Sequence, residues 1–300
     1  MRVLVTGGAG FIGSNLIDAL VARGDLVVAL DDLSTGSREN LAPDIPLRVA
    51  DVADERSLFQ SVHGEGFDVI VHAAAKTKVV ESMEKVDLYR RVIVDGTRNV
   101  VKLAEDRHVQ MLVNINTGGA LYGETPACAD EHAKTDPPSN YGRFKLEAER
   151  DVLDAEVPSI SLRLANVYGP RQRTDLEGGV VAIFLGLWRK KQTLTVFGDG
   201  KDERDYVYVG DVVEAITSAF AGERTGVFNI GTGVATSVNA LIAAMAKILG
   251  PAPGIRHAPE RAGGVELDRS CLDCGKAARQ GLWRPKTSLA DGLALTAKLA

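Results

Sequence analysis

The chain has 300 residues, 45% hydrophobic and 25% charged, a composition that fits one large folded domain or two closely joined ones. Its 35 basic and 40 acidic residues leave a net charge of −5, so we expect no general nucleic-acid binding, and any grip on phosphate must be local. Apolar runs stay below the roughly 18 residues of a membrane-spanning helix, and Met1 leads straight into a strand pattern, so neither a membrane span nor a signal peptide is expected. Three cysteines make no disulfide framework and fit a reducing, cytoplasmic location.

Short apolar runs alternate with helical patterns in the first half of the chain. The expected strands lie at Val3–Val5, Leu26–Leu30, Leu47–Val49, Asp68–Val71, Met111–Val113 and Ser159–Leu164. The expected helices lie at Phe11–Val21, Val86–Asp106 and Asn140–Glu156. Uninterrupted apolar strands between helices are typical of a parallel sheet buried on both faces. Residues 1–165 are therefore predicted to form an α/β domain of the Rossmann type, with a doubly wound parallel sheet.

Residues 166–300 follow a less regular rhythm. Loops rich in glycine, proline and charge separate a short strand at Val227–Asn229 from helices at Val212–Phe220 and Val238–Leu249. No flexible linker divides the two halves, so we expect a smaller α/β region for substrate binding that packs directly on the first domain. A segment at about 205–232 is expected to return to the Rossmann domain.

A glycine-rich loop lies between the first strand and the first helix. Its glycines stand at Gly7, Gly10 and Gly13. The first permits a tight turn, the second lets a pyrophosphate approach the backbone, and the third lets helix and strand pack closely. The helix then presents its N–H groups and positive dipole end to the phosphates. This order of elements predicts a dinucleotide site.

The end of the second strand carries the acidic partner of that loop. Asp31 lies 18 residues after Gly13, where a carboxylate accepts hydrogen bonds from an adenosine ribose. A carboxylate there repels a 2′-phosphate, so NAD is favoured over NADP. Asp51 and Val52 follow the third strand and are candidates to flank the adenine, although Asp51 could equally be a solvated helix cap.

Tyr141 and Lys145 stand four residues apart on a predicted helix and share one of its faces. A tyrosine that acts as a base near neutral pH needs its pKa lowered from ~10 by about three units, which is roughly 4 kcal/mol. A neighbouring ammonium and an oxidised nicotinamide favour the phenolate and can supply that shift. Thr117, after the fifth strand, is placed to hold the substrate oxygen, or else caps a turn.

Together these motifs resemble the extended short-chain dehydrogenase/reductases that act on nucleotide sugars, and most closely the UDP-glucose (UDP-galactose) 4-epimerases. The likeness extends over essentially the whole chain. The motifs that carry it, in order, are Thr6–Gly13, Asp31, Thr117–Gly123, Tyr141–Lys145, Arg163–Pro170 and Arg204–Val209.

The resemblance implies bound NAD, a UDP-sugar substrate and a homodimer formed by the two long helices at about 86–106 and 140–156. It implies that Thr117, Tyr141 and Lys145 are catalytic and that the last two also touch the cofactor. The implied cofactor-binding residues are Gly7, Gly10, Phe11, Ile12, Gly13, Asp31, Asp32, Asp51, Val52, Ala73, Ala74 and Ala75. The implied substrate-binding residues are Asn166, Val180, Arg204, Arg261 and Ser270, with Glu266 or Asp268 near the uridine ribose.

The implied reaction is epimerisation at C4 of the sugar, through a 4-keto intermediate, with Tyr141 taking the hydroxyl proton. A small residue at Ser270 implies room for N-acetylhexosamines as well. A 4,6-dehydratase resembles families with an Asp-Glu pair after the catalytic threonine, whereas Gly118 and Gly119 stand here. A decarboxylase, a 4-reductase and a non-catalytic NAD-binding protein remain alternatives.

Four positions depart from the family pattern. Asn116 precedes the catalytic threonine where a serine pair is usual, Ile93 replaces an asparagine, and Phe144 replaces the serine before the catalytic lysine. The loop at Gly263–Asp268 is longer than usual, which affects the register from Arg261 onward.

Two further features are given ordinary readings. His72 follows the fourth strand and is expected to be a packed strand-end histidine. Cys271 and Cys274 have the spacing of metal ligands, but no second cysteine pair or nearby histidine accompanies them, so no metal is expected.

Overall fold

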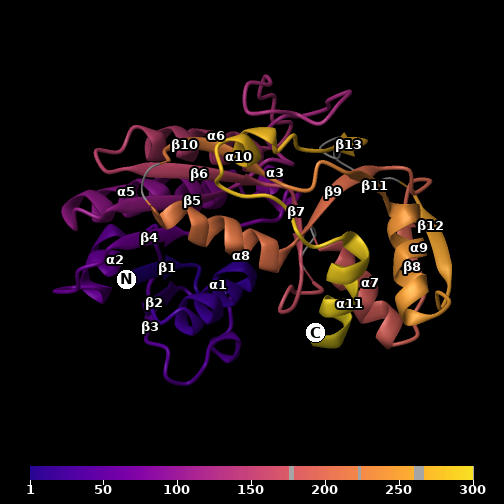
Figure 1. Cartoon of the computed structure of the whole chain (residues 1–300), viewed down its shortest axis with the longest axis horizontal. Coiled ribbons are helices and arrows are strands. Elements are labelled where there is room, and N and C mark those ends of the chain that lie inside the picture. Colours follow the sequence, from indigo (N-terminus) through magenta and orange to yellow (C-terminus); the bar gives the residue numbers. More distant parts are fainter. Residues whose placement is uncertain (176–178, 222–223, 260–266, 300) are drawn as a thin grey trace.

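A computed structural model describes residues 1–175, 179–221, 224–259 and 267–299 (Figure 1). The strands are β1 (Arg2–Thr6), β2 (Leu26–Asp31), β3 (Leu47–Val49), β4 (Val69–His72), β5 (Met111–Thr117), β6 (Ser159–Leu164), β7 (Asn166–Tyr168), β8 (Leu194–Phe197), β9 (Glu203–Tyr208), β10 (Gly226–Ile230), β11 (Ala235–Ser237), β12 (Ile255–Ala258) and β13 (Arg269–Ser270). The α-helices are α1 (Phe11–Ala22), α2 (Glu55–Ser61), α3 (Glu81–Glu84), α4 (Val86–Arg90), α5 (Gly96–Asp106), α6 (Asn140–Leu153), α7 (Val180–Arg189), α8 (Val209–Ser218), α9 (Val238–Leu249), α10 (Gly275–Arg279) and α11 (Leu289–Leu299). A π-helical turn, η2 (Arg91–Asp95), joins α4 to α5, and η1 (Arg38–Asn40) and η3 (Ala219–Ala221) are single 3₁₀ turns.

Seven parallel strands form the main sheet, in the order β10-β6-β5-β4-β1-β2-β3. In β1, β2, β4 and β5, alternate residues enter separate cores: in β1, Val3 and Val5 belong to one and Leu4 to the other. α1, α8 and α10 cover the first face, and α2, α5 and α6 cover the second. Because both faces are buried, the inner strands β1, β2 and β4 are nearly continuous apolar runs, as the sequence indicated. The predicted Rossmann-type α/β class is confirmed.

The last strand of this sheet comes from late in the chain. β10 pairs in parallel with β6, in a register that sets Phe228 opposite Leu162. α8, which precedes β10, packs against α1 in the first core. Thus the chain leaves the sheet after β6 and re-enters it some sixty residues later with its seventh strand.

The second region lies beside the carboxyl ends of the main strands (Figure 1). β9 pairs with β11, β13 and β7, and β12 pairs with β8 in a separate two-stranded sheet. A third core joins α7, α9 and α11 to β8 and β9. Helix α9 has the bounds predicted from its periodicity, with Ser237 as its N-cap accepting the Ala240 N–H at 3.1 Å. The sequence did not predict α11 or the short strands around β9, and of α7 it indicated only the C-terminal end near Trp188.

Within the described residues, no helix combines the length and hydrophobicity that a membrane crossing requires.

Candidate active site

In the glycine loop between β1 and α1, the backbone at Gly7 lies close to the first turn of α1 and to the backbone of Ala73, which follows β4. Gly7 has φ +67°, a left-handed conformation that favours glycine, and a Cβ on it would lie 2.8 Å from the Ala73 carbonyl carbon. A Cβ on Gly13 would lie 2.2 Å from the Gly7 oxygen, so the first turn of α1 has no room for a side chain there. The helix begins at Phe11 with no side chain capping its N–H groups. Those N–H groups are therefore available to a phosphate.

Asp31 ends β2 next to this loop. Its carboxylate accepts the Ala9 N–H at 3.0 Å and the Leu33 N–H at 2.9 Å. Burial raises the pKa of the Asp31 carboxyl, and these two hydrogen bonds oppose that shift. The side chain is thereby fixed at the rim of the loop, and its remaining acceptor capacity can serve a ribose diol.

One large cavity, of about 710 Å³, spans the two regions of the chain. Its dinucleotide side contains every cofactor residue expected from the sequence except Lys145: Gly7, Gly10, Phe11, Ile12, Gly13, Asp31, Asp32, Asp51, Val52, Ala73, Ala74, Ala75 and Tyr141. Of these, Asp51 also pairs with Arg91 at 3.2 Å. The volume is within the range of sites that enclose cofactors and small ligands. The glycine cradle, the free helix N-terminus and Asp31 fit a dinucleotide.

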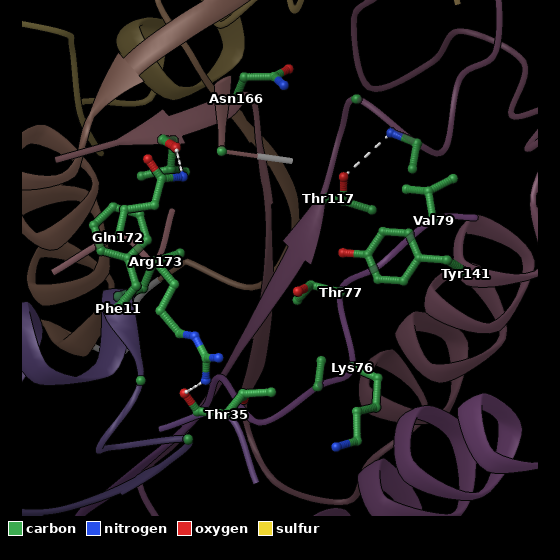
Figure 2. A pocket seen from close by; sticks show the side chains of 18 of the residues that line it. Phe11, Thr35, Lys76, Thr77, Val79, Thr117, Tyr141, Asn166, Gln172 and Arg173 are labelled. Atoms are coloured by element: carbon green, nitrogen blue, oxygen red, sulfur yellow. Dashed lines mark hydrogen bonds between the residues drawn. The ribbon is translucent and has the colours of Figure 1, made fainter. Parts of the chain in front are cut away.

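Thr117 and Tyr141 lie next to each other on one side of this cavity (Figure 2) and are joined by a side-chain hydrogen bond. Thr117 is the last residue of β5, and its hydroxyl accepts the Ala120 N–H at 3.3 Å. Tyr141 lies in the first turn of α6, which is fixed by its N-cap Ser139 and by the Ser82 hydroxyl, an acceptor for the Tyr141 N–H at 3.0 Å. The parallel β5 and the start of α6 therefore bring together two groups that are 24 residues apart in sequence.

Lys145 lies one turn further along α6 and is only 5% exposed. Its ammonium donates a hydrogen bond to the Ile115 carbonyl at 2.7 Å. Burial lowers the pKa of Lys145 to about 8, and the negative charge of Glu149 opposes that shift. Burial raises the pKa of Tyr141 to about 12, and a hydrogen bond with Thr117 acts in the opposite direction. In the protein without cofactor the phenol is thus neutral, so the ammonium alone does not supply the lowered pKa expected from the sequence.

His72 ends β4 behind the site and is 2% exposed. Thr97 donates its hydroxyl to the Ile93 carbonyl at 2.5 Å, so it accepts from His72 Nε2 at 3.0 Å. His72 Nδ1 is then the acceptor for the Thr6 hydroxyl at 2.8 Å. Burial, assisted by the charge of Lys145, lowers the pKa of His72 to about 3. This is a neutral, fully bonded core histidine, as expected.

The opposite side of the cavity belongs to the second region. Asn166, Val180, Arg204 and Ser270 all line it. Ser270 on β13 is the register partner of Arg204 on β9, so two residues 66 apart in sequence lie side by side. Arg261 and Glu266 lie outside the described residues, and Asp268 is held through its backbone N–H by Glu124.

Two buried polar atoms on this side have no partner among the described residues. They are the Tyr206 hydroxyl and Gln172 Oε1, and both side chains line the cavity. Tyr206 is 4% exposed, so its hydroxyl is shielded from bulk water. An unsatisfied buried polar group is costly unless a ligand or water completes it. These atoms therefore fit a polar ligand such as a nucleotide sugar.

Sequence reasoning missed the residues that tie the two sides together. Arg173 donates to the Thr35 carbonyl at 2.9 Å, linking the loop after β7 to the loop after β2, and both residues line the cavity (Figure 2). Lys76 also lines it and donates to Ser34 at 2.9 Å. In the sequence, only the loop composition around Gly169–Arg171 pointed to this segment, and it did not indicate that Arg173 would contact Thr35, 138 residues away.

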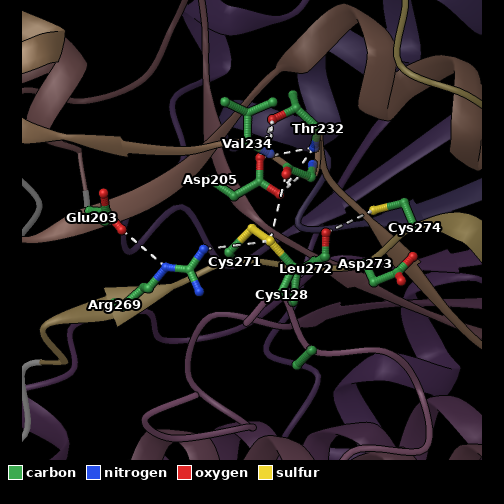
Figure 3. The surroundings of a disulfide bond; sticks show 12 residues. Cys128, Glu203, Asp205, Thr232, Val234, Arg269, Cys271, Leu272, Asp273 and Cys274 are labelled. Carbon is green, nitrogen blue, oxygen red and sulfur yellow. Dashed lines mark hydrogen bonds and ion pairs between the residues drawn. A yellow bond between two sulfur atoms is a disulfide. The ribbon is translucent and has the colours of Figure 1, made fainter. Parts of the chain in front are cut away.

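The expectation of three unpaired cysteines was wrong. Cys128 and Cys271 form a disulfide, with Cα atoms 4.4 Å apart, and Cys274 is free (Figure 3). An isolated parallel β-bridge between Ala129 and Leu272 brings the two segments together, although the cysteines are 143 residues apart in sequence. Arg269 reinforces the junction by donating to the Pro126 carbonyl at 2.9 Å and pairing with Glu203 at 3.0 Å. No sequence spacing indicates that pairing.

The chain combines a dinucleotide-binding Rossmann sheet, a threonine–tyrosine–lysine group at the carboxyl ends of its strands, and a smaller ligand-binding region. These features together define an extended short-chain dehydrogenase/reductase. Residues 3–231 match the model of the NAD dependent epimerase/dehydratase family. The chain belongs to that family.

Relatives agree over nearly the full length. The chain is 40% identical to UDP-glucose 4-epimerase of Mycolicibacterium smegmatis, covering 99% of this chain and 97% of that protein. Its structure is similar to the UDP-glucose 4-epimerase of Thermus thermophilus in complex with NAD, with TM-score 0.93, 38% identity and coverage of 99% and 98%. It is equally similar to the UDP-glucose 4-epimerase of Thermotoga maritima with UDP-glucose, with TM-score 0.93, 36% identity and coverage of 100% and 98%.

Proposed function

We propose that this protein is an NAD-dependent UDP-sugar 4-epimerase that interconverts UDP-glucose and UDP-galactose. The observation that carries the proposal is a single cavity lined at one end by the glycine loop and Asp31 and at the other by Asn166 and Arg204, with Tyr141 and Thr117 between them. Relatives and structural neighbours with that activity, found along the whole chain, support it.

The residues of the site fit the steps of such a reaction. NAD, when bound, supplies the reversible hydride acceptor for the sugar C4. Tyr141 takes the C4 hydroxyl proton and later returns it, while the Thr117 hydroxyl holds the same oxygen by a hydrogen bond. Lys145 adds positive charge beneath the tyrosine. Arg204 gives the net acidic chain a local positive charge for the diphosphate, and Tyr206 offers a hydroxyl that needs a partner.

The loop after Thr117 disfavours a dehydratase. Gly118 and Gly119 offer no acid or base for removing a proton at C5 or a hydroxyl at C6. A Cβ on Gly118 would lie 2.5 Å from the Leu272 side chain, so larger residues do not fit there without repacking. A decarboxylase or reductase keeps the same tyrosine chemistry, and the substrate decides between them and the epimerase.

Two small residues meet on the second-region side of the cavity. Ser270 lines the cavity, and a Cβ on Gly119 would lie 3.2 Å from its hydroxyl, so two small residues face each other there. We therefore propose that UDP-GlcNAc and UDP-GalNAc are substrates alongside the non-acetylated hexoses.

One assay separates these reactions. Purified protein is mixed with UDP-galactose, with UDP-GalNAc and with UDP-glucuronate, and the products are resolved by chromatography. The proposal requires conversion of UDP-galactose to UDP-glucose without added reductant. Release of carbon dioxide from UDP-glucuronate without any epimerised product would replace it by a decarboxylase, and inertness toward all three would leave a non-catalytic dinucleotide-binding protein.

We also propose a homodimer formed through the helical segment at about 86–106, which comprises α4, η2 and α5, and through α6. α5 and α6 contact each other, and ion pairs join the exposed surfaces of the two segments, with Arg90 of α4 to Glu147 at 2.8 Å and Arg98 of α5 to Asp151 at 2.9 Å. Val86, the first residue of α4, and Met83 of the preceding α3 are exposed apolar residues. Sedimentation should give a dimer mass, and Val86→Asp should yield monomers if the interface lies there.

The proposed location is the cytoplasm. Disulfides are rare in that compartment, so the Cys128–Cys271 bond is the observation that stands against it. Alkylation of cell extracts before purification decides the matter: three modified cysteines support the cytoplasm, whereas one modified cysteine supports an oxidising compartment.

A further inference from the structure

Behind the catalytic face of α6 lies a buried carboxylate that the proposed mechanism does not use. Glu149 is 2% exposed and stands one helical turn beyond Lys145, on the same face. It pairs with Arg163 of β6, with Nη2 to Oε1 at 2.5 Å and Nε to Oε2 at 3.1 Å. It also accepts the Ser161 hydroxyl at 2.9 Å. These contacts fix the carboxylate rigidly under the sheet.

The same carboxylate reaches the catalytic strand through Asn116. Asn116 Nδ2 donates to Glu149 Oε2 at 2.7 Å, and Asn116 Oδ1 accepts the Thr117 N–H at 2.8 Å. A carboxylate only accepts hydrogen bonds, so it fixes which end of the Asn116 amide faces the threonine. Asn116 Nδ2 also lies 3.4 Å from the Lys145 carbonyl. One side chain thus joins the backbone of Thr117 to the helix turn of Lys145.

The charges around Lys145 make the carboxylate important. Tyr141 and Glu149 face it from its own helix, and His72 faces it from β4. His72 is neutral above strongly acidic pH, and Tyr141 is neutral without cofactor. Glu149 is the charged group that raises the pKa of the buried Lys145 ammonium, and the same carboxylate also pairs with Arg163.

We propose that Glu149 is the positioning residue of this active site: through Asn116 it holds Thr117 against α6, and its charge keeps the buried Lys145 ammonium protonated. This rests on the proposed function for its consequence in turnover, but not for its effect on Lys145. It also explains why asparagine stands at 116 in this chain, because the side chain points away from the cavity and into the buried network.

The first test needs neither cofactor nor substrate. Lysine is labelled with ¹³C, the Lys145 signal is assigned by its loss in Lys145→Met, and its midpoint is titrated in the full chain. The wild-type midpoint should lie at about 8. Glu149→Gln should lower it by at least about one pH unit, since an opposite charge nearby shifts a pKa by about 1–3 units. Ser161→Ala is the matched control: it removes a hydrogen bond to the same carboxylate but not the charge, so the midpoint should stay.

An unchanged midpoint in Glu149→Gln, or equal shifts in both variants, overturns the proposal. If Glu149→Gln does not fold because Arg163 is left unpaired, Glu149→Gln/Arg163→Met removes both buried charges. Its Lys145 midpoint must still be lowered, but by less than in Glu149→Gln, because loss of the Arg163 positive charge acts in the opposite direction. An unshifted midpoint in that double variant overturns the proposal equally.

Turnover gives a second readout. A midpoint one unit lower leaves about one-tenth of Lys145 protonated at pH 8 instead of half, and about three-quarters at pH 6.5 instead of nearly all. UDP-galactose turnover at pH 8 relative to pH 6.5 should therefore fall about fourfold in Glu149→Gln. Asn116→Ser should instead lower kcat at every pH, with KM and the Lys145 midpoint unchanged. If wild type has no turnover, the proposed function fails, and the titration still decides the role of Glu149.

Discussion

The ionisation of Tyr141 should depend on whether the dinucleotide half of the cavity is filled. Burial raises the pKa of this phenol to about 12, which is five units above pH 7. At about 1.36 kcal/mol per unit, forming the phenolate at pH 7 costs about 7 kcal/mol, and roughly one molecule in 10⁵ carries it. The hydrogen bond with Thr117 opposes this rise but does not cancel it. A cationic nicotinamide ring at the site should therefore lower the pKa by several units.

The assay is the ultraviolet difference absorbance of phenolate, titrated with and without NAD⁺. Subtracting the same titration of Tyr141→Phe isolates one tyrosine from the five others. Without cofactor, the Tyr141 signal should emerge only near pH 12; with NAD⁺ it should move toward neutrality. The same variant should retain NAD⁺ while losing at least ~100-fold in turnover. A phenolate near neutral pH in cofactor-free protein, absent from Tyr141→Phe, would refute the argument that burial controls this group.

Three further outcomes are expected. Calorimetry should show that wild type binds NAD⁺ and strongly rejects NADP⁺, and Asp31→Asn should reduce the ratio of the two affinities. Equal affinities for NAD⁺ and NADP⁺ in wild type would contradict the role of Asp31. Ser270→Tyr should abolish turnover of UDP-GalNAc and largely keep that of UDP-galactose, so equal loss of both would remove Ser270 from the pocket. The pKa of His72 is about 3 in the folded protein and 6.5 in the unfolded chain, so the neutral histidine stabilises the fold above pH 6.5, and up to about 5 kcal/mol of that stability is lost as the pH falls toward 3. In denaturant unfolding, His72→Asn should lose less of its free energy of unfolding between pH 6.5 and pH 3 than wild type does. An identical pH dependence in the two proteins would contradict the assignment.

The sheet and the dinucleotide site of the first half could be predicted because their signals lie close together in the sequence. Val3–Val5, the glycines at 7, 10 and 13, and Asp31 are each read from neighbours in sequence, and the structure places them at one cavity. The spacing of Tyr141 and Lys145 on one helix was also readable. What the residues did not reveal was the environment: a phenol and an ammonium buried deeply enough to raise one pKa and lower the other.

The second half was harder because its elements are short and its contacts distant. β13 has two residues, and its place beside Arg204 depends on pairing with β9 rather than on any periodicity. The Cys128–Cys271 bond and the Arg173–Thr35 link each join segments more than 130 residues apart. Asn116 was noticed only as a departure from a family pattern, since its partner Glu149 lies 33 residues on and carries no motif.

The late arrival of β10 has a consequence for how the chain is made. β6 is buried along its whole length, yet its outer neighbour begins at Gly226, 62 residues after β6 ends at Leu164. At about 5–20 residues per second on the ribosome, that edge stays unpaired for about 3–12 s. An apolar unpaired strand is a template for aggregation, so nascent chains should need chaperone protection during this interval. A growing chain can complete its main sheet only once β10 has been made, which ends at Ile230. The match to the family model ends directly afterwards, at residue 231.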